Sequence, residues 1–426
     1  MAEPQYNRTV SEDGLKIISE QMPWVRSVSV GIWITTGSVY EREEEAGISH
    51  MLEHMVFKGT AKRTGLQIVQ EIEGVGGHIN AFTSKELTCF YAQVLDEHLG
   101  LALDVLCDIL TSPTLSADDV EREKLVITEE IRHYEDTPHE LIFDYFASTL
   151  YGEHPLARPI MGTVQTVSSL NNDRLKNYLD QNYPRNRMVV AAAGSLSHDG
   201  LIAEIETRLK KRQRPETNAV IPIKYPEPRT KKFPRTVQGV HLCRGVQGVS
   251  YSDKRKMAAL VLSNILGGGM SSRLFQRVRE KEALAYNVFS FLDTMKHTGT
   301  FGVYLGTDPQ RLDYALKVLD EEYNRILEDG IPEDELTRAK EQLKGNLVLG
   351  LEGTSGRMFR LAKLEIYLGR FLTLDETISM IESVTVDEMM DLAREFLNID
   401  KQYTAIILPK EEAVHDYRSS QGNQSE

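Results

Sequence analysis

The feature that most constrains the fold of this chain is a proline-rich, charged segment near its middle. The segment "RPETNAVIPIKYPEPRTKKFPR" (214–235) holds five prolines and lacks hydrophobic periodicity, which is typical of a linker. At 426 residues the chain is also longer than one hydrophobic core usually serves. We therefore expect an N-terminal domain over 1–213, a linker over 214–235, a C-terminal domain over 236–412 and a disordered tail over 413–426.

Secondary-structure patterns follow a similar order on the two sides of this linker. Before it, β-branched runs predict strands and periodic apolar residues predict helices. The strands are expected at 27–38, within 76–95 and at 186–196, and the helices at 46–58, 96–111 and 116–150, the last opened by Ser116. After the linker, strands are expected at "GVHLCRGV", "TGTFGVYLGTD" and "QYTAIILP", and helices at "KMAALVLSNILGG" and "SSRLFQRVREK". This order predicts an α+β fold with two similar domains in tandem.

Composition and charge exclude several classes of function. The net charge of −14 argues against nucleic acid as a partner. No apolar run is long enough to span a membrane, and the N-terminus has neither a signal-peptide core nor the pattern of a transit peptide. The three cysteines, Cys89, Cys107 and Cys243, are far apart and odd in number, which favours reduced thiols. We expect a soluble protein in the cytoplasm.

One short segment carries candidate metal ligands. In "GISHMLEHMVFKGT" (47–60), His50, Glu53 and His54 are spaced i, i+3 and i+4, so a helix places them on one face. Two imidazoles one turn apart can bind one zinc ion, and the glutamate between them can take a proton from water. The alternative is a solvated helix face that carries two histidines by chance.

A catalytic zinc usually has a third protein ligand, commonly a carboxylate. The helical segment "EREKLVITEEIRHYEDTPHE" supplies candidates. Glu123 and Glu130 are seven residues apart and share a helix face, whereas Glu129 points elsewhere. This spacing permits a third ligand on the segment without deciding which glutamate it is.

Several segments together resemble a known family. HxxEH is the inverse of the common HExxH zinc motif and marks the inverzincins. "AGISHMLEHMVFKGT", "GGHINAFTSKELTCFYAQVL", "EREKLVITEEI" and "SSRLFQRVREKEALAYNV" resemble the pitrilysin-type zinc peptidases, in particular the branch with the β-subunit of mitochondrial processing peptidase and its bacterial relatives. The resemblance implies that each domain is a mainly antiparallel sheet with helices packed on it. It also implies that the two domains form half of a clamshell chamber.

The resemblance implies a Zn²⁺ cofactor and assigns the residues around it. His50 and His54 match the family's zinc ligands, and Glu53 matches its general base. The third ligand falls at Glu130, the residue just before the isoleucine of "VITEEI". Glu123 matches a supporting glutamate, which we expect to contact a ligand rather than the metal.

Substrate-binding residues are also implied by the resemblance. In the family, the strand at "NAFT" is a sheet edge to which the peptide adds as a further strand, and Asn80 and Ala81 match the contacting residues. Arg279 and Tyr286 match a pair that steadies the substrate carbonyl and the oxyanion as it forms. Phe57 matches a residue that lines the pocket after the cut, although packing of the zinc-binding helix is its simpler role. Without the resemblance, the "NAFT" segment would be an ordinary edge strand, Arg279 a surface charge and Tyr286 a residue of a strand.

Two acidic residues are candidates for determining specificity. Glu140 and Asp144 match family positions that hold a basic residue near the cut. Their i, i+4 spacing allows both to face the same pocket. The alternative for this pair is a solvated acidic stripe on a helix.

The resemblance implies a zinc endopeptidase that hydrolyses extended peptides or unfolded segments. The family encloses its chamber with four domains, whereas this chain offers two, so we expect a homodimer. The competing hypothesis is a non-catalytic core or assembly subunit, a role that relatives take after losing the metal motif. A third hypothesis is a chain that needs another subunit for activity. The intact motif favours the enzyme.

Overall fold

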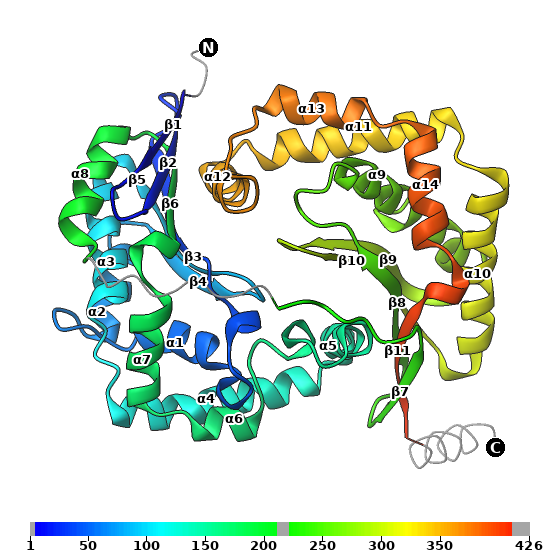
Figure 1. The fold of residues 1–426 in the computed structure, drawn as a ribbon, viewed down its shortest axis with the longest axis horizontal. Helices are drawn as coiled ribbons and strands as arrows, with labels where there is room; N and C mark the ends of the chain where they lie inside the picture. Colours follow the sequence, from blue (N-terminus) through cyan, green and yellow to red (C-terminus); the bar gives the residue numbers. More distant parts are fainter. Residues whose placement is uncertain (1–4, 211–220, 411–426) are drawn as a thin grey trace, which may run out of the picture. The chain divides into compact units, whose positions relative to one another are not determined.

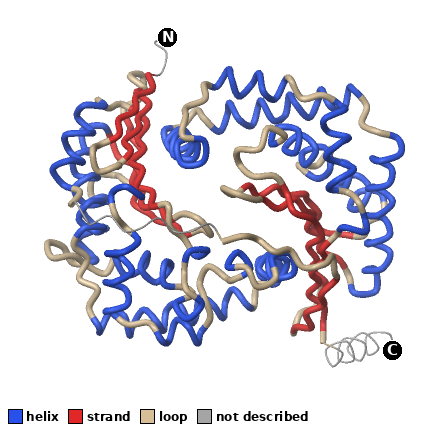
Figure 2. Tube along the Cα trace, viewed as in Figure 1, coloured by secondary structure: helices blue, strands red, loops and turns tan. Residues whose placement is uncertain are grey.

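The structure is a computed structural model that describes residues 5–210 and 221–410 (Figure 1). The chain forms two compact units. The first comprises Met1–Arg132, Arg158–Ile221 and Val348–Leu372, and the second comprises His133–Ala157, Pro222–Leu347 and Thr373–Glu426. Each unit holds one sheet and the helices that pack on it (Figure 2).

The first unit is built on a six-stranded sheet. In spatial order its strands are β1 (Gln5–Val10), β2 (Lys16–Gln21), β6 (Met188–Gly194), β3 (Ser27–Ile34), β5 (Thr88–Leu95) and β4 (His78–Thr83). β2 and β6 pair in parallel, and the other neighbouring strands pair antiparallel. β4 therefore lies at an edge of the sheet, as the sequence predicts.

Helices cover both faces of the first sheet. They are α1 (Ile48–Val56), α2 (Gly65–Glu73), α3 (Leu99–Thr111), α4 (Ala117–Glu135), α6 (Val164–Ser169), α7 (Asn172–Asn182), α8 (His198–Arg208) and α12 (Thr354–Leu368). Val28 and Val30 of β3 are fully buried in a cluster with residues of α1 and α3. Trp33 of the same strand points to the other face and packs with Met358 and Leu361 of α12. The sheet thus separates two apolar layers.

The second unit is built on a five-stranded sheet. In spatial order its strands are β7 (Thr230–Arg235), β11 (Tyr403–Pro409), β8 (Val240–Gly248), β10 (Gly299–Thr307) and β9 (Ala285–Thr294). Its helices are α5 (Pro138–Tyr151), α9 (Lys256–Gly267), α10 (Leu312–Asp329), α11 (Glu333–Gly350), α13 (Leu374–Glu382), α14 (Val386–Phe396) and the π-helix η6 (Phe275–Lys281). The remaining short elements are 3₁₀ helices: η1 (Ser38–Tyr40), η2 (Glu43–Glu45), η3 (Asp96–His98), η4 (Pro155–Ala157), η5 (Arg185–Arg187), η7 (Pro309–Arg311) and η8 (Ile399–Lys401).

The two sheets share one topology. The order β7-β11-β8-β10-β9 repeats the order β2-β6-β3-β5-β4, and β7 and β11 are parallel as β2 and β6 are. The helices follow the same plan: α7 packs on α1 as α14 packs on α9, and α2 packs on β4 as η6 packs on β9. This repeat confirms the prediction of two similar α+β domains with mainly antiparallel sheets.

The two repeats exchange one helix each. α5 lies in the first half of the chain and packs on β8 and β11 of the second sheet. α12 lies in the second half and packs on β2, β3 and β6 of the first sheet. The compact units are therefore not the consecutive segments expected at 1–213 and 236–412, because an apolar helix face does not encode which sheet it will cover.

Three local expectations differ from the structure. The single helix expected over 116–150 is two helices, α4 and α5. Pro138 is the first residue of α5, a position that favours proline. The expected linker contains a strand, since β7 pairs with β11, while its first residues, 214–220, lie outside the described residues, as does the tail at 413–426. The segment "SSRLFQRVREK" contains the π-helix η6 where an ordinary helix was expected.

Two further expectations concern the state of the cysteines and the absence of membrane-spanning segments. Cys89, Cys107 and Cys243 are all free and buried, which agrees with reduced thiols. Burial raises the pKa of the Cys107 thiol to about 12, so this thiol stays protonated. Across the described residues, none of the helices combines the length and the apolar character needed to cross a membrane.

Candidate metal centre

A buried carboxylate anchors the N-terminus of α1, the helix that carries the HxxEH motif. Glu41 accepts hydrogen bonds from the backbone N–H groups of Gly47 and Ser49, both at 2.8 Å. Gly47 has φ 95°, a left-handed conformation suited to glycine, and a Cβ there would collide with the Met161 carbonyl. The Ser49 hydroxyl lies 2.8 Å from the Tyr178 hydroxyl. These contacts fix where α1 begins and therefore which way its polar face points.

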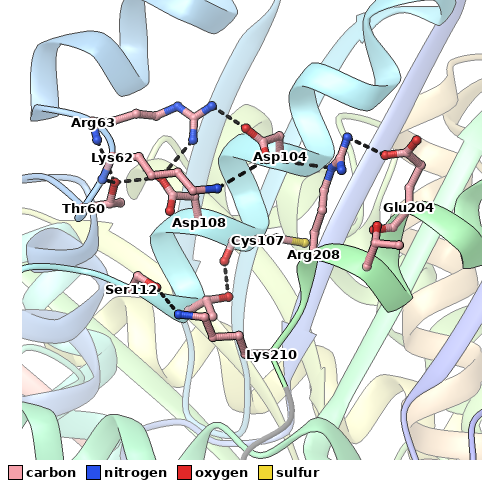
Figure 3. A network of polar contacts seen from close by, with 12 residues as sticks. Thr60, Lys62, Arg63, Asp104, Cys107, Asp108, Ser112, Glu204, Arg208 and Lys210 are labelled. Carbon is pink, nitrogen blue, oxygen red and sulfur yellow. Dashed lines mark hydrogen bonds and ion pairs between the residues drawn. The ribbon is translucent and has the colours of Figure 1, made fainter.

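The loop that follows α1 is held by a network of polar contacts (Figure 3). Arg63, whose side chain is 10% exposed, contacts Glu71 at 2.9 Å, Asp104 at 2.5 Å and Asp108 at 2.9 Å. Thr60 donates a hydrogen bond to Asp108 at 2.6 Å. Burial acts to lower the pKa of Arg63, but the three carboxylates outweigh it and raise that pKa. The loop is thereby tied to α2 and α3, so both ends of α1 are fixed.

The structure brings together three side chains that can hold one metal ion. Donor atoms of His50, His54 and Glu130 all lie within 4.8 Å of one another. Nε2 of His50 is 3.8 Å from one carboxylate oxygen of Glu130, and Nε2 of His54 is 3.7 Å from the other. Two imidazoles and one carboxylate are a donor set typical of a catalytic zinc site. Glu129 instead pairs with Arg132 at 2.5 Å on the exposed side of α4.

Glu123 fixes the orientation of His54. Its carboxylate lies 2.8 Å from Nδ1 of His54 and 2.5 Å from the Lys58 ammonium, and only 4% of its side chain is exposed. An ionised carboxylate can only accept, so the proton of His54 sits on Nδ1 and the Nε2 lone pair faces Glu130. Burial acts to raise the pKa of Glu123, but His54 and Lys58 together lower it. The ligand contact expected of Glu123 is thus present.

The pKa values of the two histidines shift in opposite directions. Burial and the neighbouring His54 lower the pKa of His50 to about 4, so His50 is neutral. Burial acts in the same direction on His54, but its contact with Glu123 and the charge of Glu130 raise the pKa of His54. Nδ1 of His50 is buried without a hydrogen-bond partner among the described residues. A neutral imidazole is the metal-binding form, so this donor set fits a divalent cation.

Glu53 lies on the same helix and contacts the edge strand. One of its carboxylate oxygens accepts a hydrogen bond from the Thr83 hydroxyl of β4 at 2.5 Å. Burial raises the pKa of Glu53, and the bond from Thr83 offsets part of this effect. A carboxylate in this environment can take up and return a proton more readily than an exposed one.

The residues expected to contact substrate in the first unit lie on β4 and at the end of α1. Asn80 and Ala81 are in the edge strand, where the Asn80 side chain accepts a hydrogen bond from the Ala81 N–H at 2.8 Å. Phe57 follows α1, and its ring centroid lies 6.3 Å from that of Phe90. Phe57 also packs against the main apolar cluster of the unit, which supports the packing role.

Arg279 and Tyr286 lie in the second unit, on an irregular stretch of backbone. Arg279 belongs to the π-helix η6, and its guanidinium carbon is 4.7 Å from the Phe275 ring centroid. Ala283 has φ 49°, a conformation that residues with a side chain rarely adopt. Tyr286 follows in β9 with 59% of its surface exposed. Such irregularities are common near functional sites.

Glu140 and Asp144 both lie on α5 in the second unit. The Tyr134 hydroxyl donates to the Glu140 carbonyl at 3.1 Å. Burial raises the pKa of Tyr134, and the charges of Asp144 and Glu140 raise it further. A cavity of about 410 Å³ in this unit is lined by Tyr134, His139, Glu140, Phe143, Asn287, Phe289 and Tyr304. A carboxylate among aromatic rings is an environment that suits a cationic side chain.

Comparison with known proteins places the chain in a family. The family model described as "Insulinase (Peptidase family M16)" matches residues 16–164, and that described as "Peptidase M16 inactive domain" matches residues 169–343. The chain belongs to peptidase family M16. The first match contains the candidate ligands and Glu53, whereas the second covers most of the second repeat.

Relatives of this M16 chain span almost its full length. "Uncharacterized zinc protease YmxG" of Bacillus subtilis is 40% identical over 92% of this chain and 96% of its own. A protein of Streptomyces coelicolor, also named an uncharacterized zinc protease, is 40% identical over 92% of this chain and 87% of its own. Among solved structures, a protease from Helicobacter pylori has a TM-score of 0.87 at 21% identity, over 95% of this chain and 100% of that one. The latter supports the fold.

Three residues of the M16 site were not identified from the sequence: Glu41, Lys58 and Thr83. Lys58 lies i+4 from His54, a spacing that indicates a shared helix face and could have suggested it. Thr83 is a polar residue at the end of the expected edge strand. Glu41 lies six residues before Gly47 in irregular backbone, and no local pattern indicates that it contacts α1.

Proposed function

We propose that the chain is a zinc-dependent endopeptidase that hydrolyses extended peptides or unfolded segments. The observation that carries this proposal is the convergence of His50, His54 and Glu130, with Glu53 on the same helix. The donor set fits zinc, and the relatives named above are called zinc proteases, which supports zinc as the ion.

The catalytic residues divide the work between proton transfer and orientation. His50, His54 and Glu130 would hold a zinc ion, which would supply Lewis acidity for a peptide carbonyl and for water. Glu53 takes a proton from water as the water attacks the carbonyl carbon, and then returns it to the leaving amide nitrogen. Thr83 holds one oxygen of Glu53 and leaves the other free for the proton.

Peptide binding is assigned to the edge of the first sheet. An extended peptide would pair with the main chain of β4 and contact Asn80 and Ala81. Arg279 and Tyr286 would steady the substrate carbonyl and the oxyanion as it forms. Main-chain pairing accepts most sequences, so any strong specificity must come from side-chain pockets.

A preference for basic residues near the cut is the finer part of the proposal. It is supported by the cavity that contains Glu140, with aromatic rings beside the carboxylate. Asp144 lies one turn further along α5, where its charge adds to that of Glu140. This preference, a cytoplasmic location and assembly as a homodimer would together describe an enzyme similar to the processing peptidases.

A non-catalytic core or assembly subunit is the second candidate. One finding favours it, which is the match of residues 169–343 to a family model described as inactive. Among the described residues, however, the group that can hold a metal lies outside that match. His50, His54 and Glu130 all precede residue 169, where the match begins. The match described as inactive therefore includes none of the candidate metal ligands.

The experiment that tests the proposal is cleavage of a library of short basic peptides by the purified chain, read by mass spectrometry with and without a chelator. Metal content is measured on the same sample. Glu130→Gln is compared with its matched control Glu129→Gln, because Glu129 is adjacent in sequence but points to solvent. We expect chelator-sensitive cuts beside Arg or Lys, lost in Glu130→Gln and retained in Glu129→Gln.

Each other outcome removes a defined part of the proposal. Chelator-sensitive cuts without basic preference would keep the peptidase and discard the roles of Glu140 and Asp144. Absence of cleavage with one zinc per chain would indicate a missing partner subunit. Absence of both cleavage and zinc would support the non-catalytic subunit.

A further inference from the structure

His241, Gly306 and Tyr286 lie in one row across the second sheet. His241 of β8 pairs with Gly306 of β10. On the other side of β10 the register with β9 shifts between Gly306 and Thr307, which leaves Tyr286 as the extra residue of a β-bulge. A Cβ built on Gly306 would stand only 2.7 Å from the Tyr286 ring. The glycine therefore lets this ring lie across β10 toward His241.

A buried imidazole links two tyrosine hydroxyls of different exposure. The Tyr286 hydroxyl is 3.5 Å from Nε2 of His241, and the Tyr304 hydroxyl is 2.8 Å from its Nδ1. His241 is 7% exposed and Tyr304 is 1% exposed, whereas Tyr286 is 59% exposed. The imidazole thus contacts a buried phenol and a phenol at the surface, and these two phenols lie close enough that Tyr286 adds to the effect of burial in raising the pKa of Tyr304.

The protonation of His241 determines how it acts on each partner. Burial, helped by the neighbouring His139, lowers the pKa of His241 to about 4, so the ring is neutral and carries one N–H. A phenol is a more acidic donor than a neutral imidazole, so Tyr304 donates to Nδ1. The ring proton then resides on Nε2 and faces the oxygen of Tyr286.

We propose that His241 is a positioning residue for Tyr286, holding the phenol oxygen with its Nε2–H so that the hydroxyl proton of Tyr286 points away from the sheet. The inference rests on the proposed function, in which Tyr286 donates that proton in a hydrogen bond to the substrate carbonyl or oxyanion. The 3.5 Å separation is long, as catalytic hydrogen bonds often are before substrate binds. The Tyr304 hydroxyl accounts for Nδ1 of this buried imidazole, and the Tyr286 oxygen is the partner of Nε2.

A double-mutant cycle tests this inference through activity. His241→Phe removes both ring nitrogens but keeps an aromatic ring, and Tyr286→Phe removes the hydroxyl. We expect His241→Phe to lower kcat about tenfold with little change in KM, and to have no further effect in the Tyr286→Phe background. An equal loss in both backgrounds would mean that His241 only supports the fold, and the inference would be overturned.

A second measurement does not depend on catalysis. In the full chain labelled with ¹⁵N-histidine, NMR reports which ring nitrogen carries the proton, and the absence of a signal in His241→Phe assigns it. We expect the proton on Nε2, a shift of its resonance in Tyr286→Phe, and a mixture of tautomers in Tyr304→Phe. A proton on Nδ1 in the wild type, or an unchanged resonance in Tyr286→Phe, would overturn the inference.

The two measurements separate this inference from the function on which it rests. If the wild-type chain cleaves no peptide but the NMR results are as expected, the proposed function fails and the positioning of Tyr286 by His241 stands. If the chain is an active peptidase but the cycle shows no coupling, the function stands and the inference fails.

Discussion

α1 and α9 occupy the same place in the two repeats but present different chemistry. α1 packs on the edge strand β4 and contacts α4, whereas α9 packs on the edge strand β9 and contacts α11. In the first repeat, His54 faces Glu130 across this contact at 3.7 Å. In the second, the Asn264 amide donates to the Gln342 side chain at 3.1 Å. The candidate metal centre of the first repeat thus corresponds to a pair of neutral amides in the second.

The correspondence extends along the long helices α4 and α11. Glu123 and Glu335 lie seven residues before the α4 and α11 residues just named. Each pairs with a cation that follows the first helix: Glu123 with Lys58 at 2.5 Å, and Glu335 with Arg273 at 2.6 Å. The scaffold is therefore shared, and a small number of side chains decides whether it can hold a metal.

The difference has an energetic consequence for each repeat. Two amides satisfy each other by hydrogen bonding and need nothing more. Imidazoles and carboxylates gathered with unsatisfied lone pairs need a cation to offset the cost of bringing them together. The first repeat thus holds a site that is incomplete by itself, while the corresponding contact in the second repeat is satisfied within the chain.

The largest difference in activity between matched variants of the two repeats is expected for Glu53, the residue proposed to transfer the proton. Glu53→Gln should lower kcat by about 10²–10⁴-fold while the metal is retained, because the amide cannot accept the proton. In the second repeat, Ser263 of α9 occupies the place that Glu53 has on α1, and its hydroxyl lies 3.0 Å from that of Ser290. Ser263→Ala should change kcat by less than about twofold. Peptide hydrolysis rates and zinc content measured on both variants check this. Near-wild-type cleavage by Glu53→Gln would refute its role as the base.

The next largest effect is expected at the paired glutamates. Glu123→Gln should weaken zinc binding by about 10–100-fold, because His54 loses the partner that fixes its tautomer. Glu335→Gln should leave zinc affinity unchanged and lower the free energy of unfolding by about 1–2 kcal/mol through its contact with Arg273. Competition with a chromogenic chelator measures affinity, and urea unfolding measures stability. Equal zinc affinity in both variants would show that Glu123 does not act on the metal centre.

Local sequence patterns were sufficient for the face of α1 and insufficient for its surroundings. His50, Glu53 and His54 share a face because of helix geometry alone, which needs no knowledge of the rest of the fold. The choice between Glu123 and Glu130 depends on which part of α4 lies opposite His50 and His54 of α1. The packing of two helices that are distant in sequence determines this, and local periodicity does not. Periodicity on α4 therefore left both glutamates as candidates, and only the family resemblance distinguished them.

Two of the features that the sequence did not predict depend on contacts between distant segments, whereas the break at Pro138 has a local signal. The amphipathic pattern continues through Pro138, so the break between α4 and α5 was missed although proline is favoured in the first turn of a helix. The exchange of α5 and α12 between sheets has no local signal. The bulge at Tyr286 requires the space above Gly306, which is twenty residues away in sequence and adjacent only in the sheet.

The amide pair of the second repeat sharpens the comparison through stability. Asn264 is 8% exposed and also donates to the Ala339 carbonyl at 3.2 Å. Asn264→Ala should lower the free energy of unfolding by about 1–2 kcal/mol, because it leaves buried acceptors without a donor. His54→Ala should instead abolish zinc binding and cost less stability in the metal-free chain. Urea unfolding of both variants with and without zinc checks this, and zinc loss in Asn264→Ala would contradict it.

The smallest effect is expected where each first helix contacts its edge strand. Thr83→Val removes the hydroxyl that holds one oxygen of Glu53, so the carboxylate can rotate and kcat should fall about three- to tenfold with unchanged zinc content. In the second repeat, Ser290 of β9 makes the equivalent contact to Ser263 of α9. Ser290→Ala removes this contact, and kcat should change by less than about twofold. Thr83→Ser restores a hydroxyl and should recover most of the rate. If Thr83→Ser were as slow as Thr83→Val, the loss would come from the packing of the Thr83 methyl group, and the base would not depend on this hydrogen bond.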